Sequence, residues 1–379
     1  MQCAIVGSGL AALTSYATLR HGGVRPEEVA VFGTHEDPTE VWRTRAAAIR
    51  QRVMRSESDG HLAAAAFPGL AVREAVRRRT PSPLLASALN RYHPTVDEFL
   101  AHAEQVRERS GWSRSFHAQR IARVTPVAGG FDLDRAGTFR HVLIATGHPG
   151  LARPAEHADA VHAYEPHEYA PKVAVVGAGM AAATEWLNAL AAGSEVVSIR
   201  RREPLRRPLN VPRPLFSKRG LAAFHAATDE QRAARLRELS AASYPPGAKW
   251  DEPIRAAVAE GRFTTSSEEA QSKLRRGSEE AQTSNGEHLA DFQVICATGF
   301  LKGWQSDTLL SDLVEQDGVA TQGRWIVLAA DSTVPGLTDS TRTLALAGVA
   351  AQWAFPAADT IAGAKYAARG FLRRVCPTR

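Results

Sequence analysis

The 379-residue sequence lacks the signatures of several common enzyme classes. Its three cysteines (Cys3, Cys296 and Cys376) lie far apart and form no CxxC pair, which argues against a disulfide framework and a dithiol redox centre. No HxxxH or HExxH spacing occurs, so we expect no metal site. No GxSxG turn occurs either, which disfavours hydrolysis by a serine nucleophile.

Long apolar runs and a leader are also missing. No stretch of about 18 apolar residues is present, and the first strand pattern begins almost at the N-terminus. We therefore expect a cytoplasmic enzyme without a membrane partner. The net charge is +6, but the arginine runs at 77–79 and 200–202 are not interleaved with aromatic residues, so we expect no nucleic-acid partner. No feature of the sequence specifies an oligomeric state.

A glycine-rich turn follows the apolar run at residues 4–6. The turn reads GSGLAA over residues 7–12 and opens a helical pattern, which is the context that a dinucleotide-binding fingerprint requires. Gly7 would allow the tight turn, Gly9 would let a diphosphate approach the backbone, and Ala12 would permit close helix–strand packing. The free N–H groups and positive dipole end of the helix would face the phosphates.

The same arrangement occurs a second time. The apolar run at 173–176 precedes GAGMAA over residues 177–182, in which Gly177, Gly179 and Ala182 repeat the three roles. Packing alone is the alternative explanation for each copy. Two copies in matching contexts instead predict two dinucleotides in one chain, between which electrons pass.

The charge after the second fingerprint indicates which nucleotide binds there. The strand pattern at 195–199 ends in Arg200 and Arg201 rather than in a carboxylate. A carboxylate at this place accepts from the ribose hydroxyls of NAD, whereas arginine accommodates a 2′-phosphate. The sequence therefore favours NADPH over NADH, with a solvated arginine cluster as the alternative.

The order of elements predicts the architecture. Alternating strands and helices imply parallel, doubly wound sheets, and the length suits two or three domains. Residues 149–171 resemble a linker, and the region 203–260 has no clear strand pattern. Pro356 is placed in the first turn of a final helix that runs towards Arg374.

Several further motifs resemble those of one superfamily. The turns Ala145–Gly147 and Ala297–Gly299 are ATG turns, and the second belongs to a string that runs from Asp291 to Phe300. Residues 161–164 are similar to the tail of an FxGxxxH motif, although Glu156 and Ala158 replace its leading F and G. Together with the two fingerprints, these features resemble the two-dinucleotide-binding flavoproteins. Within them the chain is similar to the class B flavin monooxygenases: flavin-containing, Baeyer–Villiger and N-hydroxylating enzymes.

The resemblance implies an α/β fold of two Rossmann-like dinucleotide-binding domains, with the NADPH domain inserted in the FAD domain. The implied boundaries are 1–165 for the first part of the FAD domain, 166–296 for the NADPH domain and 297–379 for the second part of the FAD domain. The residue that ends the second strand, where a carboxylate normally holds the FAD ribose, is Gly33. Glu36 or Asp37 would substitute, or the backbone alone would form the clamp.

The resemblance also implies the site residues. Arg52, Arg55, Ser56 and Asp59 are the candidate flavin-proximal catalytic residues, with a polar surface loop as the alternative. His162 would lie near the nicotinamide, or would be an ordinary linker residue. The implied FAD-binding residues are Gly7, Gly9, Ala12, Glu36, Trp42, Arg50, Gln51, Thr146, Gly147 and Gly348. The implied NADPH-binding residues are Gly177, Gly179, Ala182, Arg200, Arg201, His162, Thr298 and Gly299.

The activity implied is that of an FAD-dependent, NADPH-consuming monooxygenase. Such an enzyme inserts one atom of O₂ into a small molecule through a flavin C4a-(hydro)peroxide, and we favour a nitrogen or another soft heteroatom as the acceptor. Baeyer–Villiger oxygenation of a ketone or aldehyde and an FAD-dependent NAD(P)H reductase or dehydrogenase are the alternatives. An amine-oxidising flavoprotein that no longer uses NADPH and a redox-sensing nucleotide-binding module also remain open.

Overall fold

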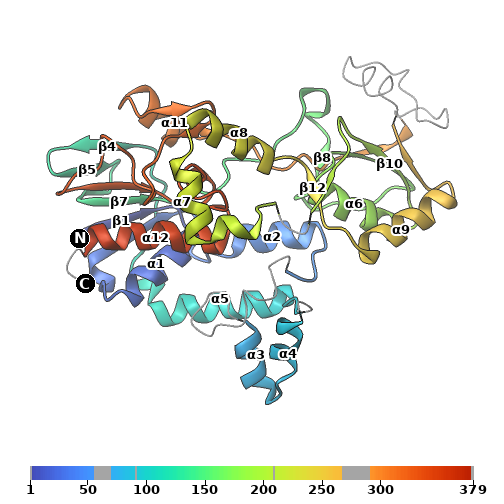
Figure 1. Cartoon of the computed structure of the whole chain (residues 1–379), viewed down its shortest axis with the longest axis horizontal. Helices are drawn as coiled ribbons and strands as arrows, with labels where there is room; N and C mark the ends of the chain where they lie inside the picture. The colour runs from blue at the N-terminus through green and yellow to red at the C-terminus, as the bar shows by residue number, and fades with distance from the viewer. Residues whose placement is uncertain (1, 55–69, 90–91, 208–209, 267–290, 377–379) are drawn as a thin grey trace.

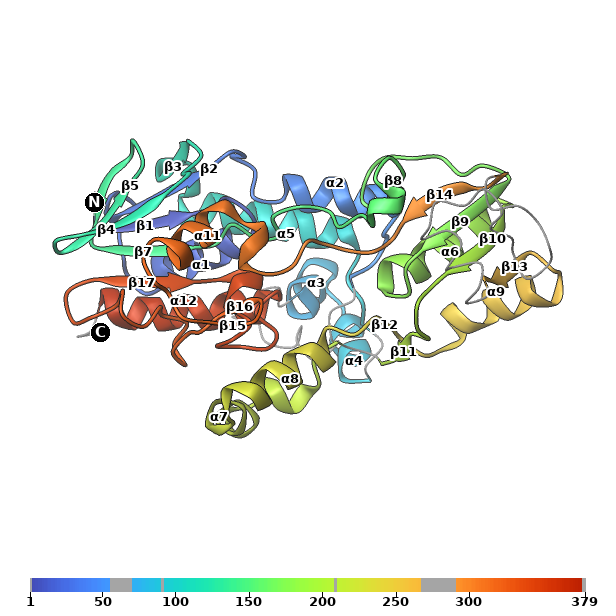
Figure 2. The same cartoon turned by 90° about the horizontal axis from the view of Figure 1, so that it is seen from above.

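The computed structural model describes residues 2–54, 70–89, 92–207, 210–266 and 291–376. It confirms the predicted α/β fold with parallel sheets. Figures 1 and 2 show one sheet at each end of the long axis, with α2 (Glu40–Ala48) lying between them. Across these ranges, no helix combines the length and the apolar character that crossing a membrane would require.

The first sheet has five parallel strands in the order β17-β7-β1-β2-β3. Successive side chains of a strand point to opposite faces, so Ala4 and Val6 join one buried cluster, while Cys3 and Ile5 join the other. Burial of both faces is typical of parallel sheets. The strands are β1 (Cys3–Val6), β2 (Val29–Gly33), β3 (Phe116–Ala118), β7 (His141–Ile144) and β17 (Thr343–Leu346).

Helices from both ends of the chain cover one face of this sheet. Leu13 of α1, Ala103 of α5 and Phe371 of α12 belong to the same buried cluster. On the other face lies a three-stranded antiparallel sheet, whose Phe131 and Leu133 contribute to the second cluster. These elements are α1 (Leu10–His21), α5 (Val96–Ser110), α12 (Ile361–Val375), β4 (Val124–Val127), β5 (Gly130–Leu133) and β6 (Gly137–Phe139).

The second sheet also has five parallel strands, in the order β13-β10-β9-β14-β8. Trp186 of α6 and Ala257 of α9 pack on one face together with Val173 and Val175. In sequence the whole sheet falls between β7 and β17, which are neighbours in the first sheet. The elements are β8 (Val161–His162), β9 (Lys172–Val176), β10 (Glu195–Ile199), β13 (Phe263–Thr265), β14 (Gln293–Cys296), α6 (Met180–Ala191) and α9 (Ala248–Ala259).

The region 203–260, which had no expected structure, contains two helices that pack against the first half of the molecule. Phe224 of α7 (Lys218–Ala226) shares a buried cluster with Trp353 and Phe355. In α8 (Asp229–Leu239), the guanidinium of Arg232 lies 4.3 Å from the ring centre of Trp353 and donates to its carbonyl oxygen at 2.5 Å. Short pairs β11 (Leu205–Arg206) with β12 (Ser243–Tyr244) and β15 (Thr321–Gln322) with β16 (Trp325–Ile326) complete the strands.

The final helix begins later than predicted. Pro356 does not lie in its first turn, because α12 starts at Ile361. The side chain of Thr360 accepts a hydrogen bond from the Gly363 N–H at 3.2 Å, and this cap fixes the start. A proline is tolerated in the first turn of a helix but does not itself define one.

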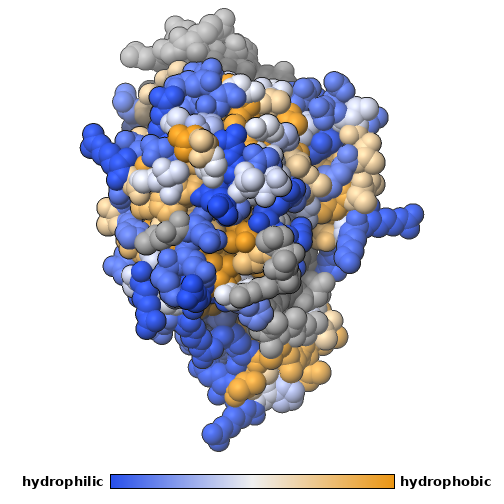
Figure 3. All heavy atoms as spheres, turned by 90° about the vertical axis from the view of Figure 1, so that its left-hand side faces the viewer, coloured by the Kyte–Doolittle hydropathy of each residue, from blue (hydrophilic) through white to orange (hydrophobic). Residues whose placement is uncertain are grey.

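Helices α3 (Leu70–Arg78) and α4 (Ser82–Ala88) project from α5 (Figure 1). Figure 3 shows the end-on face as mainly hydrophilic, with hydrophobic side chains in several places and one group of them at its lower end, the end to which α3 and α4 extend in Figure 1. Val76 and Leu85 of these helices are exposed, as is Leu89. Helix α11 (Thr308–Glu315) lies above the first sheet in Figure 1.

Candidate functional site

The first fingerprint forms a tight turn with an open approach. Gly7 has a φ of +118°, and a Cβ added there would lie 2.2 Å from the Ala145 carbonyl oxygen, so only glycine fits. A Cβ added at Gly9 would meet no atom within 4 Å. Ala12 is fully buried against the sheet. Gly9 is the N-cap residue of α1. No side chain caps this helix end and no acidic residue lies in the first turn, so the helix N–H groups are open to an anion.

The second fingerprint repeats this geometry. Gly177 has a φ of +137°, and an added Cβ would lie 2.5 Å from the Ala297 carbonyl oxygen. Gly179 faces open space within 4 Å and begins α6 without a side-chain cap. Ala182 is fully buried. Both turns are thus crowded at the first glycine and open at the second, as diphosphate binding requires.

Each ATG turn lies beside one fingerprint. The Ala145 N–H donates to the Val6 carbonyl at 2.7 Å, and the Ala297 N–H donates to the Val176 carbonyl at 2.8 Å. The glycines that follow, Gly147 and Gly299, have φ values of +78° and +80°. The first fingerprint and the first ATG turn therefore lie together at the first sheet, and the second fingerprint and the second ATG turn lie together at the second sheet.

The two ATG threonines hold the crossing segments between the sheets. The hydroxyl of Thr146 donates to Asp307 at 2.9 Å, and that of Thr298 donates to the carbonyl oxygen of Ala152. The segments also pair with each other, because the Leu301 N–H donates to the Gly150 carbonyl at 2.9 Å. Gly348, with a φ of +68°, lies against Ala11 at the start of α1 (a Cβ on Gly348 would be 3.4 Å away).

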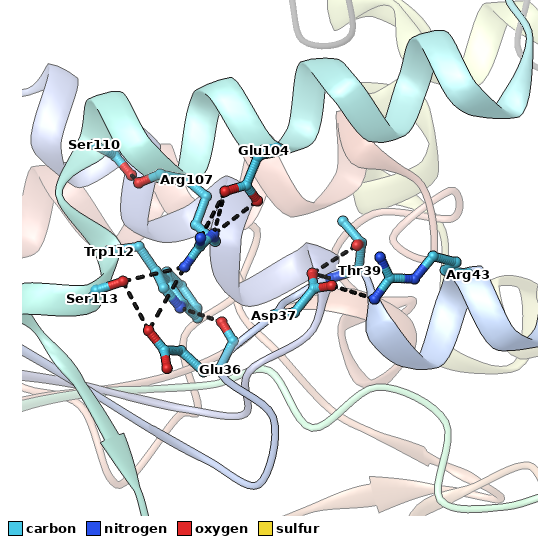
Figure 4. A network of polar contacts seen from close by, with 9 residues as sticks. All are labelled: Glu36, Asp37, Thr39, Arg43, Glu104, Arg107, Ser110, Trp112 and Ser113. Atoms are coloured by element: carbon cyan, nitrogen blue, oxygen red, sulfur yellow. Dashed lines mark hydrogen bonds and ion pairs between the residues drawn. The ribbon is translucent and has the colours of Figure 1, made fainter.

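At the end of β2, Gly33 cannot carry a side chain. A Cβ there would lie 2.2 Å from the hydroxyl oxygen of Ser8. Glu36 comes three residues later, and its carboxylate accepts from Ser113 at 2.9 Å and lies 3.7 Å from Arg107 (Figure 4). The Glu36 side chain is 59% exposed, so it remains accessible to a ribose.

Asp37, the other candidate for the ribose, lies just before α2 and is held by residues at the start of that helix. Its carboxylate accepts from the Thr39 N–H at 2.8 Å and contacts Arg43 at 2.6 Å (Figure 4). Burial acts to raise the pKa of Asp37, but the Thr39 hydrogen bonds and the Arg43 charge lower it below its usual value. This carboxylate is thus engaged at the start of α2.

Arg200 lies at the end of β10, level with the second fingerprint. Its neighbour Ile199 pairs with Val176, and the Gly177 N–H donates to the Ile199 carbonyl at 2.9 Å. The side chain of Arg200 is 16% exposed, whereas Arg201 is exposed on the surface. Arg200 is therefore the arginine built into this site.

Of the other predicted FAD residues, Arg50 points towards the second sheet. Its guanidinium lies 3.1 Å from Glu168 and 4.6 Å from the ring centre of Tyr169. Trp42 of α2 contacts Phe99 edge-to-face, with ring centres 4.9 Å apart. Both side chains are thus occupied by protein contacts.

The candidate catalytic stretch is only partly described. Gln51 donates to the Val53 carbonyl at 3.0 Å, and Arg52 is exposed, with its carbonyl accepting from the Val96 N–H at 3.0 Å. These contacts hold the backbone against the start of α5. The candidates Arg55, Ser56 and Asp59 lie outside the described residues.

His162 is fully buried in a stack of rings at the junction of the sheets. It stacks on Tyr164, which stacks on Phe300, which stacks on His148, with ring centres 5.6, 4.9 and 4.1 Å apart. Burial lowers the pKa of His162 to about 4, so the ring is neutral near pH 7. The stack as a whole connects the linker, which carries His162 and Tyr164, to the crossing segments that carry His148 and Phe300.

Four charged or titratable residues at this junction carried no recognisable sequence motif. The guanidinium of Arg45 lies 4.8 Å from the Phe300 ring centre. Burial lowers the pKa of His148 to about 4, with the charges of Arg45 and Lys302 adding to the effect. Asp359 is exposed, and its charge interacts with that of Lys302. No spacing could reveal this cluster, because its members are far apart in the sequence.

The described part of the chain contains no group of three or more histidine, cysteine or acidic side chains arranged to bind a metal ion. All three cysteines are free. Burial raises the pKa of Cys3 to about 12 and that of Cys296 to about 11. Neither thiol is therefore a reactive thiolate near neutral pH.

No protein-family model matches the sequence, and no curated protein matches it. Solved structures do match over nearly the whole chain. An ornithine hydroxylase from Pseudomonas aeruginosa superposes with a TM-score of 0.69 at 15% identity, covering 99% of both chains. An ornithine N-hydroxylase from Kutzneria sp. 744, in a structure with reduced FAD, NADP⁺ and L-ornithine, gives a TM-score of 0.67 at 16% identity and 99% coverage of both.

A bacillithiol disulfide reductase from Bacillus cereus is also similar, with a TM-score of 0.60 at 14% identity, covering 100% of this chain and 99% of the other. The chain thus shares its fold both with ornithine hydroxylases and with a bacillithiol disulfide reductase. The resemblance expected from the motifs is confirmed at the level of the fold.

Proposed function

We propose that this chain is an FAD-dependent, NADPH-consuming monooxygenase that transfers one oxygen atom to a nitrogen or another soft heteroatom of a small molecule. The observation that carries the proposal is the duplicated turn. In each parallel sheet, one strand is followed by a turn with a crowded first glycine and an open second glycine. A helix without a side-chain cap follows each turn, and an ATG crossing lies beside it.

The residues present fit two dinucleotides. Open space at Gly9 and Gly179 admits a diphosphate to the backbone, and the free N–H groups of α1 and α6 complement its charge. At the first site, Glu36 is accessible to a ribose, and at the second, Arg200 suits a 2′-phosphate. FAD would therefore bind at the first sheet and NADPH at the second.

We further propose that the NADPH domain is inserted in the FAD domain. The pairing of β17 with β7 supports this, because all strands of the second sheet lie between them in sequence. The segments expected from the sequence are 1–165, 166–296 and 297–379. The pairing of Val161–His162 with β14 favours a first boundary slightly before residue 161.

When bound, reduced flavin supplies the chemistry, because it activates O₂ for transfer of one oxygen atom. The protein binds the cofactors, orients them and excludes water. His148 and His162 are neutral near pH 7 because burial lowers the pKa of each to about 4. The two rings thus add no imidazolium charge at the junction, where Arg45 and Lys302 supply the nearby positive charges.

The reductase alternative receives less support. Disulfide reduction by a protein dithiol needs two neighbouring cysteines, whereas the three cysteines of this chain are separate and free, and two of them are buried with raised pKa values. A reductase that uses other acceptors would share the two nucleotide sites. Product analysis separates the two activities.

The test is anaerobic reduction of the FAD-loaded protein by NADPH, followed by an oxygen pulse with candidate amines and sulfides. We expect NADPH to bleach the flavin, and an oxygenated product to form in proportion to the NADPH consumed. Reduction followed only by hydrogen peroxide release, with rapid turnover of a dye acceptor, would indicate a reductase. A protein that binds no FAD would contradict the proposal.

A further inference from the structure

The second nucleotide site contains an acidic residue beside the arginine that suits a 2′-phosphate. Glu203 lies three residues after Arg200, and its carboxylate oxygen is 2.7 Å from the guanidinium. The Arg200 side chain is 16% exposed and that of Glu203 is 76% exposed. The arginine is thus fixed in the protein, while its carboxylate partner lies on the solvent side.

These two residues line a recess of about 590 Å³. Its apolar part includes Trp186 and Phe263, whose rings meet edge-to-face with centres 5.6 Å apart. Arg200 also donates to the Thr265 hydroxyl at 3.3 Å. Its buried Nε–H has no acceptor among the described residues. The guanidinium is therefore held in place and retains an unused donor.

The first nucleotide site shows the same spacing. Phe32 pairs with Val6 as Ile199 pairs with Val176, so Gly33 and Arg200 follow equivalent strand ends. In each case a glutamate comes three residues later. Glu36 at the first site therefore corresponds to Glu203 at the second.

The two kinds of nicotinamide nucleotide make opposite demands at such a place. A carboxylate accepts hydrogen bonds from the two ribose hydroxyls of NADH. A 2′-phosphate instead needs the guanidinium free and is repelled by a neighbouring carboxylate. An exposed ion pair contributes little stability, so its acidic partner is displaced readily.

Building on the proposed function, we propose that Glu203 sets the choice between NADPH and NADH. With a 2′-phosphorylated nucleotide, Glu203 gives up the guanidinium of Arg200 and turns to solvent. With a nucleotide that lacks the phosphate, Glu203 stays on Arg200 and accepts from the ribose hydroxyls. The chain therefore discriminates less against NADH than Arg200 alone would allow.

The test measures binding of two adenosine probes to the full-length, FAD-loaded protein by calorimetry at low salt. The probes are 2′,5′-ADP, which carries the 2′-phosphate, and 5′-AMP, which lacks it. For Glu203→Gln we expect the affinity for 2′,5′-ADP to rise about 3- to 10-fold. The affinity for 5′-AMP should stay the same or fall by about 3-fold.

Glu260→Gln is the matched control, because Glu260 also pairs with an arginine of the same half of the molecule, Arg262 at 2.6 Å. We expect it to leave the ratio of the two affinities within about twofold of the wild-type value. An equal shift in the control would show a general effect of charge, and would overturn the inference.

A second variant, Arg200→Gln, tests whether the guanidinium binds the 2′-phosphate. It should lower the affinity for 2′,5′-ADP about 10- to 100-fold and leave 5′-AMP nearly unchanged. Adding Glu203→Gln to this variant should give a smaller gain in affinity than it gives in the wild type, because only the repulsion between the carboxylate and the phosphate is left to remove. If the ratio of the affinities for 2′,5′-ADP and 5′-AMP is the same in Glu203→Gln as in the wild type, the inference about Glu203 is overturned, but the proposed function is not. A wild-type protein that binds neither probe would overturn the proposed function, and the inference with it.

Discussion

The four fingerprint glycines have two different tasks. Gly7 and Gly177 are crowded, because an added Cβ would lie within 2.2 and 2.5 Å of a carbonyl oxygen, and both have positive φ values. Gly9 and Gly179 have ordinary extended backbone angles and open space around them. The crowded glycines therefore serve the fold, and the open ones serve the proposed ligands.

Alanine substitutions at the first site separate these tasks. Gly7→Ala should lower the free energy of unfolding of the FAD-free protein by about 2–4 kcal/mol, because of the strained φ and the clash with Ala145. Gly9→Ala should change it by less than about 1 kcal/mol. Yet it should weaken FAD binding at least about tenfold, because a methyl group would occupy the approach of the diphosphate.

Thermal unfolding of the FAD-free variants and fluorescence titration with FAD measure the two effects. Each variant is the control for the other, since both replace a glycine of the same turn with alanine. Full FAD affinity in Gly9→Ala would contradict the assignment of the open glycine to the diphosphate.

The backbone geometry of single residues was predictable where a local pattern defines it. The glycine pattern identified both turns, because the tight turn and the open approach depend on local geometry. The contacts of Arg45 with Phe300, or of Arg200 with Glu203, depend on how distant or flexible side chains meet. Sequence spacing led to the prediction of Arg200, but it did not indicate that Glu203 forms an ion pair with it.

At the scale of elements, a buried polar cluster attaches α6 to the linker before β9. Glu185 of α6 is fully buried and accepts from His167 at 2.9 Å and from Tyr169 at 2.8 Å. Burial acts to lower the pKa of His167, but hydrogen bonds to Glu185 and to the Glu165 carbonyl raise it above its usual value. Arg50, which lies over the Tyr169 ring, is the nearby positive charge that opposes this rise.

This cluster predicts a pH-dependent stability. A histidine with a raised folded-state pKa stabilises the fold most below its unfolded pKa of about 6.5, and this contribution is lost as pH rises through the folded pKa. His167→Gln should therefore cost about 3 kcal/mol near pH 6 and less in mildly alkaline solution. His21→Gln, at an exposed position at the end of α1, is the control.

Urea unfolding of the wild type and both variants across this pH range measures the difference. The cost of His167→Gln should fall with rising pH, while that of His21→Gln should stay small throughout. A cost that is independent of pH would show that His167 contributes by packing alone.

Element boundaries were predictable where a local signal defines them. Thr95 caps α5 as its sequence indicates, with Glu98 completing a capping box. The final helix was misplaced, because the effective cap is Thr360 rather than Pro356. Helices α7 and α8 were not assigned, since their apolar side chains pack on Trp353 and Phe355 from the far end of the chain.

At the scale of the whole molecule, the two sheets are joined by more than their chain crossings. Helices α7 and α8 leave the second sheet and pack on the first half, where Arg232 binds the Trp353 carbonyl. At the junction, the stacked rings of His162, Tyr164, Phe300 and His148 connect the linker with both crossings. These contacts hold the proposed nucleotide sites in a fixed relation, which electron transfer between two cofactors requires.

Removing the central ring of the stack should weaken this connection. Phe300→Ala leaves Tyr164, His148 and Arg45 without their shared partner, at a cost of about 2 kcal/mol. Because the loss falls between the sheets, calorimetry should resolve two unfolding transitions where the wild type shows one. Leu301→Ala is the control, because Leu301 is adjacent in sequence and 40% exposed. A single transition in Phe300→Ala, lowered only as much as in Leu301→Ala, would show that the ring stack does not couple the two halves.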